Sequence, residues 1–337
     1  MPAPEREKPG QTLPIIPNEI YFCIFERVAP SAGPLTPEQV QAFTRLSRVC
    51  RFFANFCLPR VFELVEFSGS IFHDDTPTQL RNDAAYKTSR ESVLCAQIAA
   101  KQPLALALAK VVKVCRFKHW KLDEAGSWAV RLFATKYIAG MLHMTNIREL
   151  EFTDSFVDEE HWNAASALPS LEKLSFIFCK FFRGPADVEL EKRVKIKVSH
   201  LRVLHCATGF RQPLAAIDVQ CLRALDIDHK HLDQVDWHLL SSLAELRFHD
   251  PYGAFRVTEE SFVERLPAFL VQAPQSLETL RLAVDSVAQA TARNVFDDPA
   301  WGNLASLRSL TLLVKSQSRA VLLDVVSQTF IERMTIN

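Results

Sequence analysis

The chain has 337 residues, of which 48% are hydrophobic, enough for an extended core and a small second domain. Lys and Arg together number 39, as do Asp and Glu, so the formal net charge is zero. Proteins that act mainly on phosphate backbones are usually basic, so nucleic acid is not expected as a partner. The longest apolar run, Leu104–Ala109, is far too short to span a bilayer, and a membrane is not expected either.

The eight cysteines are scattered and none forms C-x-x-C, which argues against a disulfide framework. The opening M-P-A-P-E-R-E-K-P-G lacks the apolar segment of a secretory signal, so we expect a cytoplasmic or nuclear protein. The sequence contains no G-x-S-x-G, G-K-[ST], G-x-G-x-x-G or H-E-x-x-H motif. An enzyme is therefore not expected, nor is a cofactor.

Residues 1–12 are polar and proline-rich, and we expect a disordered tail. The next residues, 13–60, predict a small module of two helices. Ile20, Ile24 and Val28 recur every four residues in the first. Thr36 and Gln39 form a capping box for the second. Its apolar stripe is expected to continue unbroken until Pro59, through Val40, Phe43, Leu46, Val49, Cys50 and Phe53.

Two stretches of this module, I-P-N-E-I-Y-F-C-I-F-E-R-V (16–28) and L-S-R-V-C-R-F-F (46–53), resemble an F-box. The F-box is a small helical module of eukaryotic ubiquitin ligase subunits, with a pattern of roughly L-P-x-E-I-x-x-x-I-F followed by V-C-(R/K)-x-(F/W). This chain departs from the pattern at Ile16 and has a longer connection between the helices. The resemblance implies that the module docks a Skp-type adaptor and, through it, a cullin ligase. The residues implied in that contact are Pro17, Ile20, Ile24, Phe25, Leu46, Val49 and Cys50.

Residues 61–146 are expected to hold a helical linker and the first irregular repeats. Thr88 and Glu91 form a capping box for one helix, and Ser127–Met144 has the pattern of an amphipathic helix. Two apolar triplets in this region suit strands: Phe62/Val65/Phe67 and Val112/Cys115/Phe117.

From 147 to 337 the chain repeats the pattern L-x-x-L-x-L, whose positions four and six point the same way from a strand. Successive copies begin 21 to 34 residues apart, which indicates a stacked solenoid. The copies are Ile147/Leu150/Phe152, Leu171/Leu174/Phe176, Leu201/Leu204/Cys206, Leu222/Leu225/Ile227, Leu243/Leu246/Phe248, Leu277/Leu280/Leu282, Leu307/Leu310/Leu312 and Ile331/Met334/Ile336.

This pattern resembles the leucine-rich-repeat family, whose units lay one short parallel strand on a concave face and a helix or loop on the convex face. The family often has Asn or Cys at position nine, and among these copies only Cys179 keeps it. We therefore expect an α/β fold: an F-box-like helical module followed by an irregular leucine-rich-repeat solenoid.

An F-box followed by leucine-rich repeats is a known architecture, similar to divergent members abundant in fungi. It implies the substrate receptor of a cullin-type ubiquitin ligase, with an unidentified target protein bound by the repeats. The alternative is a free-standing interaction scaffold whose N-terminal helices cap the open end of the array.

Side chains at positions five and seven are expected on the concave face. Asp226 and Asp228 then lie beside Arg247 and His249, with His205 one strand earlier. We favour a polar patch that binds a protein partner, because solenoids bind with their concave faces. Cross-strand ion pairs are one alternative, and a metal site of carboxylates and imidazoles is another.

Two short polar stretches are interpreted as surface structure. K-R-V-K-I-K (192–197) alternates basic and apolar residues, which predicts a strand with one solvated face. H-K-H (229–231) predicts an exposed turn.

Overall fold

A long parallel sheet runs through the whole solenoid. The computed structural model describes residues 7–8, 11–12, 17–28, 35–69, 89–120, 128–181, 194–206, 211–249, 262–284, 299–314 and 334–336. Within these residues ten strands form one sheet in the order β14-β13-β12-β11-β10-β9-β7-β5-β4-β3. They are β3 (Leu64–Ser68), β4 (Val114–Lys118), β5 (Glu149–Thr153), β7 (Lys173–Ile177), β9 (His200–Leu204), β10 (Ala224–Asp228), β11 (Glu245–His249), β12 (Thr279–Val284), β13 (Ser309–Val314) and β14 (Met334–Ile336).

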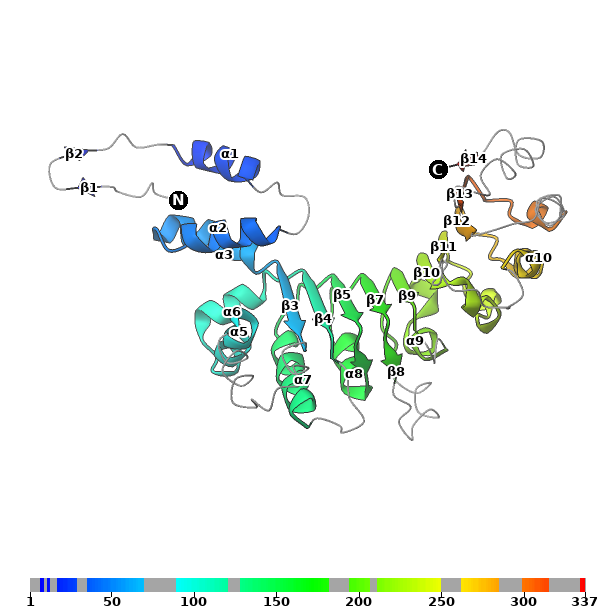
Figure 1. The fold of residues 1–337 in the computed structure, drawn as a ribbon, viewed down its shortest axis with the longest axis horizontal. Coiled ribbons are helices and arrows are strands. Elements are labelled where there is room, and N and C mark those ends of the chain that lie inside the picture. The colour runs from blue at the N-terminus through cyan, green and yellow to red at the C-terminus, as the bar shows by residue number, and fades with distance from the viewer. Residues whose placement is uncertain are drawn as a thin grey trace.

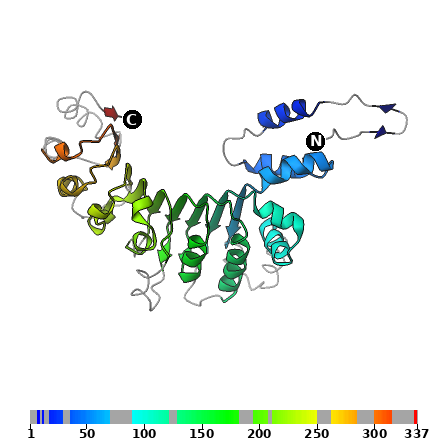
Figure 2. The same cartoon turned by 180° about the vertical axis from the view of Figure 1, so that it is seen from behind.

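Equivalent triplet positions lie side by side in neighbouring strands. Leu150 pairs with Leu174, and Leu225 pairs with Leu246. The strands form an arc, and the helices that connect them lie on its outer side (Figures 1 and 2). The predicted α/β solenoid of stacked parallel strands is confirmed, and β3 and β4 extend it with the two triplets before residue 147.

One predicted triplet is out of register by three residues. Leu201 pairs with Leu174, which is a position-four residue. The third copy therefore begins at Val198 rather than Leu201, and Cys206 is its position nine. Apolar residues at 198, 201, 203, 204 and 206 fit the template in both registers. Only the pairing with the neighbouring strand separates the two.

Four phenylalanines at position six form a stack through the N-terminal half of the core. Phe67, Phe117, Phe152 and Phe176 have neighbouring ring centroids 5.0, 5.2 and 5.5 Å apart. This spacing follows the strand separation of about 4.8 Å. Each ring is covered by the next repeat, as expected in an array whose single units cannot bury their own apolar face.

Helices and 3-10 turns connect the strands on the convex side. The predicted helix around 127–144 is confirmed as α7, and the helix after residue 88 as α5. A separate parallel pair, β6 (Phe156–Val157) and β8 (Lys180–Phe181), lies within the connections. The helical elements are α5 (Arg90–Ala99), α6 (Pro103–Ala109), α7 (Trp128–Met141), α8 (Glu159–Ser166), α9 (Arg211–Ala216), η3 (Val219–Cys221), η4 (His229–Gln234), η5 (Trp237–Leu239), α10 (Phe262–Gln272) and η6 (Pro299–Asn303).

The cap of α5 is Ser89, whose side chain accepts a 3.1 Å hydrogen bond from the Ser92 N–H. The predicted cap, Thr88, lies outside the described residues. Pro103 opens α6 at its first turn, where its missing N–H costs nothing. In the described ranges no single helix is long and apolar enough to cross a membrane. The pair α5 and α6 reaches that length and composition only together, across a 117° bend.

The two polar stretches differ from expectation. In the described part of 192–197, Ile196 forms only an isolated parallel bridge with Ile217, and β9 begins at His200. The predicted exposed turn at 229–231 is wrong for His231, which is 3% exposed. This residue lies within η4, where the chain packs back onto the core.

The N-terminal region contains β1 (Glu7–Lys8) paired antiparallel with β2 (Gln11–Thr12), then α1 (Asn18–Val28), α2 (Pro37–Leu46) and α3 (Arg51–Val61). Most of the predicted disordered tail lies outside the described residues. The capping box of Thr36 and Gln39 opens α2 as predicted. Beyond α1, however, the single predicted helix is wrong, because the chain breaks between α2 and α3.

The break follows from burial. At about 100° per residue, one straight helix would place Phe43 and Phe52 on opposite faces. Both are buried in the same core. The Ser47 hydroxyl donates to the Thr44 carbonyl 2.8 Å away, which satisfies a carbonyl in the last turn of α2. Pro59 does not end α3, which continues for two more residues to Val61.

Candidate functional site

The strands of the first repeats end in a residue with left-handed backbone conformation. His119, Asp154, Phe178 and His205 occupy position eight after β4, β5, β7 and β9, with φ between 50° and 59°. This conformation costs a residue with a Cβ about 1–2 kcal/mol. The N–H groups of the first three donate to the position-seven carbonyl of the next strand at 2.7 to 2.9 Å. These hydrogen bonds help to hold the strained turns in place.

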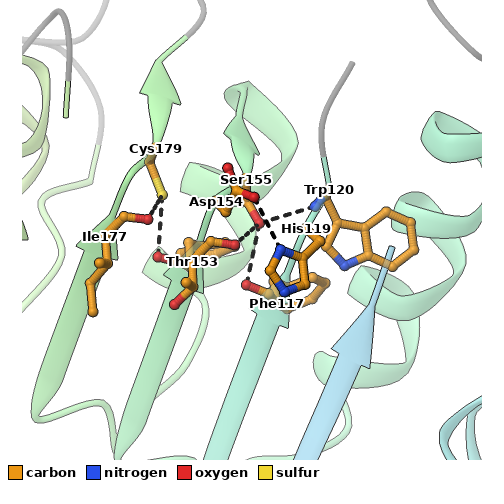
Figure 3. A network of polar contacts seen from close by, with 9 residues as sticks. Phe117, His119, Trp120, Thr153, Asp154, Ser155, Ile177 and Cys179 are labelled. Carbon is orange, nitrogen blue, oxygen red and sulfur yellow. Dashed lines mark hydrogen bonds and ion pairs between the residues drawn. The ribbon is translucent and has the colours of Figure 1, made fainter. Parts of the chain in front are cut away.

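The residue after each left-handed turn points inward, with its side-chain donor 2.8 to 3.7 Å from the position-six carbonyl of the preceding strand: Trp120, Ser155, Cys179 and Cys206. The Ser155 hydroxyl also lies 2.7 Å from the Thr153 carbonyl, and the Cys206 thiol 3.4 Å from the Leu204 carbonyl. Figure 3 shows Ser155 and Cys179 in this role, with the His119–Asp154 pair beside them. Position nine therefore forms a ladder of hydrogen-bond donors in this half of the array, in which Cys179 is the family-type residue that the sequence predicted. Cys206 joins the ladder once the register of its copy is corrected.

At β10 the pattern of turns changes. The His205 N–H donates to the carboxylate of Asp228, with 2.6 Å between His205 N and Asp228 Oδ2. Asp228 is the position-seven residue of β10 and is fully buried. The chain then enters η4. Lys230 Nζ lies 3.6 Å from Asp228 Oδ2 and balances its charge. Asp228 therefore closes the turn with its side chain, where the earlier repeats use a carbonyl.

A charged cluster lies on the concave face around Asp226, the position-five residue of β10. Asp226 is 3% exposed and pairs in register with Arg202 and Arg247. Its Oδ2 lies 3.4 Å from His200 Nε2 and 3.7 Å from Arg202 Nε. Its Oδ1 lies 3.8 Å from Arg247 Nε. We name as the Asp226 cluster the residues His200, Arg202, Asp226, Arg247 and His249.

Burial and charge set the protonation of this cluster. Burial would raise the pKa of Asp226, but the hydrogen bond and charge of His200, with the charge of Arg247, outweigh it and hold that pKa below its usual value. Burial lowers the pKa of His249, despite the nearby carboxylate of Asp226. At neutral pH the cluster therefore combines an ionised carboxylate and two guanidinium groups with a neutral His249.

The metal-site alternative has no support in the described part of the chain, where no group of three or more His, Cys, Asp or Glu side chains is arranged to hold an ion. The two carboxylates have separate tasks: Asp226 faces cations from β9 and β11, and Asp228 accepts from the main chain of His205.

The predicted concave-face residues are brought together, with one change of role. Asp226, Arg247 and His249 occupy the expected positions in neighbouring strands. His205 does not occupy position five: it is a rim residue whose ring stacks on Phe178, with centroids 4.5 Å apart. The sequence analysis missed His200 and Arg202 because the copy that contains them was read from Leu201. Starting that copy at Val198 would have placed Arg202 at position five, on the concave face, with His200 two residues earlier on the same side of the strand.

The N-terminal helices have a core separate from that of the solenoid. Phe25 lies at its centre, with its ring 5.5 Å from Phe53 and stacked 4.4 Å from Phe56. The buried members of this core are Tyr21, Phe25, Phe43, Phe52, Phe53, Cys57 and Val61. Only α3 links it to the solenoid among the described residues, through Leu58 and Phe62, which pack against the solenoid core.

The residues predicted to contact an adaptor divide into two groups. The exposed ones are Pro17, Ile20, Ile24 and Val49, of which Ile20 and Ile24 are each 49% exposed and Val49 is 61% exposed. The others support the helices from within: Phe25 is buried, and Leu46 and Cys50 pack against the same core.

The sequence matches no protein-family model and no curated protein. Among solved structures the chain is similar to an internalin (inlF) from Listeria monocytogenes, with 13% sequence identity and a TM-score of 0.32. The match covers 70% of this chain and 63% of the internalin chain. A likeness this distant carries no functional weight. The repeat architecture follows from the strand pairing itself.

Proposed function

We propose that the protein is the substrate receptor of a cullin-type ubiquitin ligase, with its N-terminal helices bound to a Skp-type adaptor and its concave face bound to a target protein. The observation that carries this proposal is the position of Ile20 and Ile24. Both remain half exposed on α1, while Tyr21 and Phe25 on the same helix are buried. Surface helices normally turn their apolar side chains inward. Two isoleucines one turn apart in solvent suit a protein contact.

The packing of α3 is compatible with this function. Arg90 of α5 donates a 3.2 Å hydrogen bond to the Val61 carbonyl and lies over the Phe62 ring at 5.4 Å. Together with Leu58, these contacts attach α3 to the first repeat. Because α3 makes the attachment, the exposed side chains of α1 are not needed to close the end of the array.

The proposed activity needs no chemistry from this chain. A receptor that holds its target beside a ligase raises the local concentration of the acceptor lysines, which accelerates transfer. In this role the protein would act in the cytoplasm or the nucleus.

The test is retention of a purified Skp-type adaptor by the immobilised chain. The double variant I20D/I24D should lose the adaptor, because a carboxylate at an apolar contact must be desolvated without a partner. The matched control is V271D on α10, where Val271 is 65% exposed at the other end of the molecule. It should retain the adaptor. Retention by I20D/I24D at the wild-type level would contradict the proposal.

A free-standing interaction scaffold is the second candidate. It is favoured by the cap-like packing of Leu58 and Phe62 on the solenoid core. In a scaffold the concave face would still bind a partner, but wild-type protein would retain no adaptor.

A further inference from the structure

The charges on the concave face do not balance at its β12 side. Position five carries Arg202, Asp226, Arg247 and Arg281 in four successive strands. Glu245 binds Arg247, with 2.7 Å between Arg247 Nε and Glu245 Oε1. Asp226 is shared between two arginines. Three guanidinium groups thus face two carboxylates, which leaves one positive charge in excess.

The excess charge lies at Arg281. In the ranges that the structure describes, the side chain of Arg281 takes part in no hydrogen bond or ion pair, and its Nε is buried without a hydrogen-bond partner. Its neighbour in register on one side is Arg247, and on the other it is Thr311. Like charges on directly opposite residues destabilise a sheet. A bound anion would relieve this repulsion and accept from the guanidinium groups and the Thr311 hydroxyl.

We propose that the concave face over β11, β12 and β13 binds an acidic segment of the partner protein, with one of its carboxylates seated on Arg281 and Arg247. This inference rests on the proposed use of the concave face for target binding. A carboxylate matches the single excess positive charge, whereas a phosphate dianion exceeds it. The planar fork of an arginine suits a carboxylate, which it can bind through two parallel hydrogen bonds.

The experiment measures fluorescence anisotropy of labelled octapeptides that alternate Ala with Glu, Gln or phosphoserine, at about 50 mM salt, where screening is weak. In an extended peptide the alternating side chains lie on one face. The Glu peptide should bind about tenfold more tightly than the Gln peptide. R281Q should remove this preference, and R281K should retain part of it, because lysine keeps the charge but lacks the fork.

The matched control is R308Q. Arg308 directly precedes β13 and is 80% exposed, and its only ion pair in the described residues is a 4.0 Å contact with Glu278. Its loss changes the net charge equally and should leave the Glu preference intact. Circular dichroism melting of each variant confirms that the solenoid is folded.

Three results would overturn the inference: equal binding of the Glu and Gln peptides, equal losses in R281Q and R308Q, or binding of the phosphoserine peptide alone. The assay contains no adaptor. Failure of peptide binding therefore leaves adaptor binding intact, and the loss of adaptor binding in I20D/I24D leaves peptide binding intact.

Discussion

The main-chain N–H of His205 binds the side chain of Asp228, with 2.6 Å between donor and acceptor. In the three preceding left-handed turns the acceptor is a main-chain carbonyl. The buried carboxylate of Asp228 is therefore a structural substitute at the point where the array changes from left-handed turns to η4. This relationship explains why an acidic residue occupies a fully buried position on the concave side.

Replacing Asp228 by alanine should lower the free energy of unfolding by about 1–3 kcal/mol, because a partly buried N–H loses its acceptor. Asn retains one acceptor oxygen at the same place, so D228N should lose less. Urea unfolding followed by circular dichroism measures both. Equal losses in the two variants would show that the hydrogen bond to His205 does not account for the stabilisation.

A second prediction concerns the close approach of α5 and α7 at Gly140. A Cβ at this position would overlap Cys95 Sγ. Alanine normally favours a helix over glycine by about 1 kcal/mol. Here the overlap with Cys95 should outweigh this gain, so that G140A destabilises the protein by about 1–3 kcal/mol. The double variant C95A/G140A should recover most of the loss, and additive effects in urea unfolding would contradict the contact.

Buried and exposed cysteines should differ in thiol reactivity. Burial raises the pKa of Cys57 to about 11 and that of Cys95 to about 12. Both should resist iodoacetamide in the native protein at pH 8, since the thiolate is the reactive form. Cys23, which is exposed on α1, should be alkylated under the same conditions. Mass spectrometry of the digested protein reads this out. Alkylation of Cys57 as fast as Cys23 would show that the core of the N-terminal helices is open.

The buried imidazoles predict how stability changes with pH. Burial lowers the pKa of His231 and of His249 below 6.5. Below pH 6.5 the unfolded chain therefore binds more protons than the folded one, so stability falls as the pH falls through this window. The variant H231Q should flatten the decline between pH 7 and pH 5 in urea unfolding. An unchanged slope would mean that the pKa of His231 is the same in the folded and the unfolded chain.

Two carboxylates affect the stability of the protein at a lower pH than the imidazoles do. For Asp158, burial would raise the pKa, but the hydrogen bonds and charge of His161 and the Glu160 N–H lower it overall. The pKa of Asp226 is also below its usual value, because His200 and Arg247 outweigh the effect of burial. Their stabilisation is complete above the ordinary value of 3.8 and is lost as the pH falls below it. A decline that starts near pH 6.5 can therefore be assigned to the imidazoles.

The apolar triplets predicted most of the solenoid because period-two burial leaves few alternatives for each strand. The exception, the copy that begins at Val198, allowed two registers, and only the pairing of Leu201 with Leu174 decides between them. That single ambiguity also hid Arg202, which depends on the same register. Local pattern does not contain pairing information, so this part of the site was beyond the sequence.

The N-terminal helices show a different limit. The stripe from Val40 to Phe53 reads as one helix, and no glycine or proline interrupts it. The break arises because Phe43 and Phe52 must reach one core, which is a tertiary requirement. The burial of Asp228 and His231 also depends on tertiary packing and not on the local sequence pattern. At Asp228 a side-chain acceptor replaces the carbonyl of the earlier turns, and the chain continues directly into η4.

The most direct test of the central claim is isothermal titration of the purified full chain with a purified Skp-type adaptor. The N-terminal helices, with Ile20 and Ile24 outside their core, should form a 1:1 complex at micromolar concentration. No binding heat for the wild-type chain, combined with normal folding by circular dichroism, would contradict the assignment to a ubiquitin ligase and leave a repeat scaffold with helices at one end.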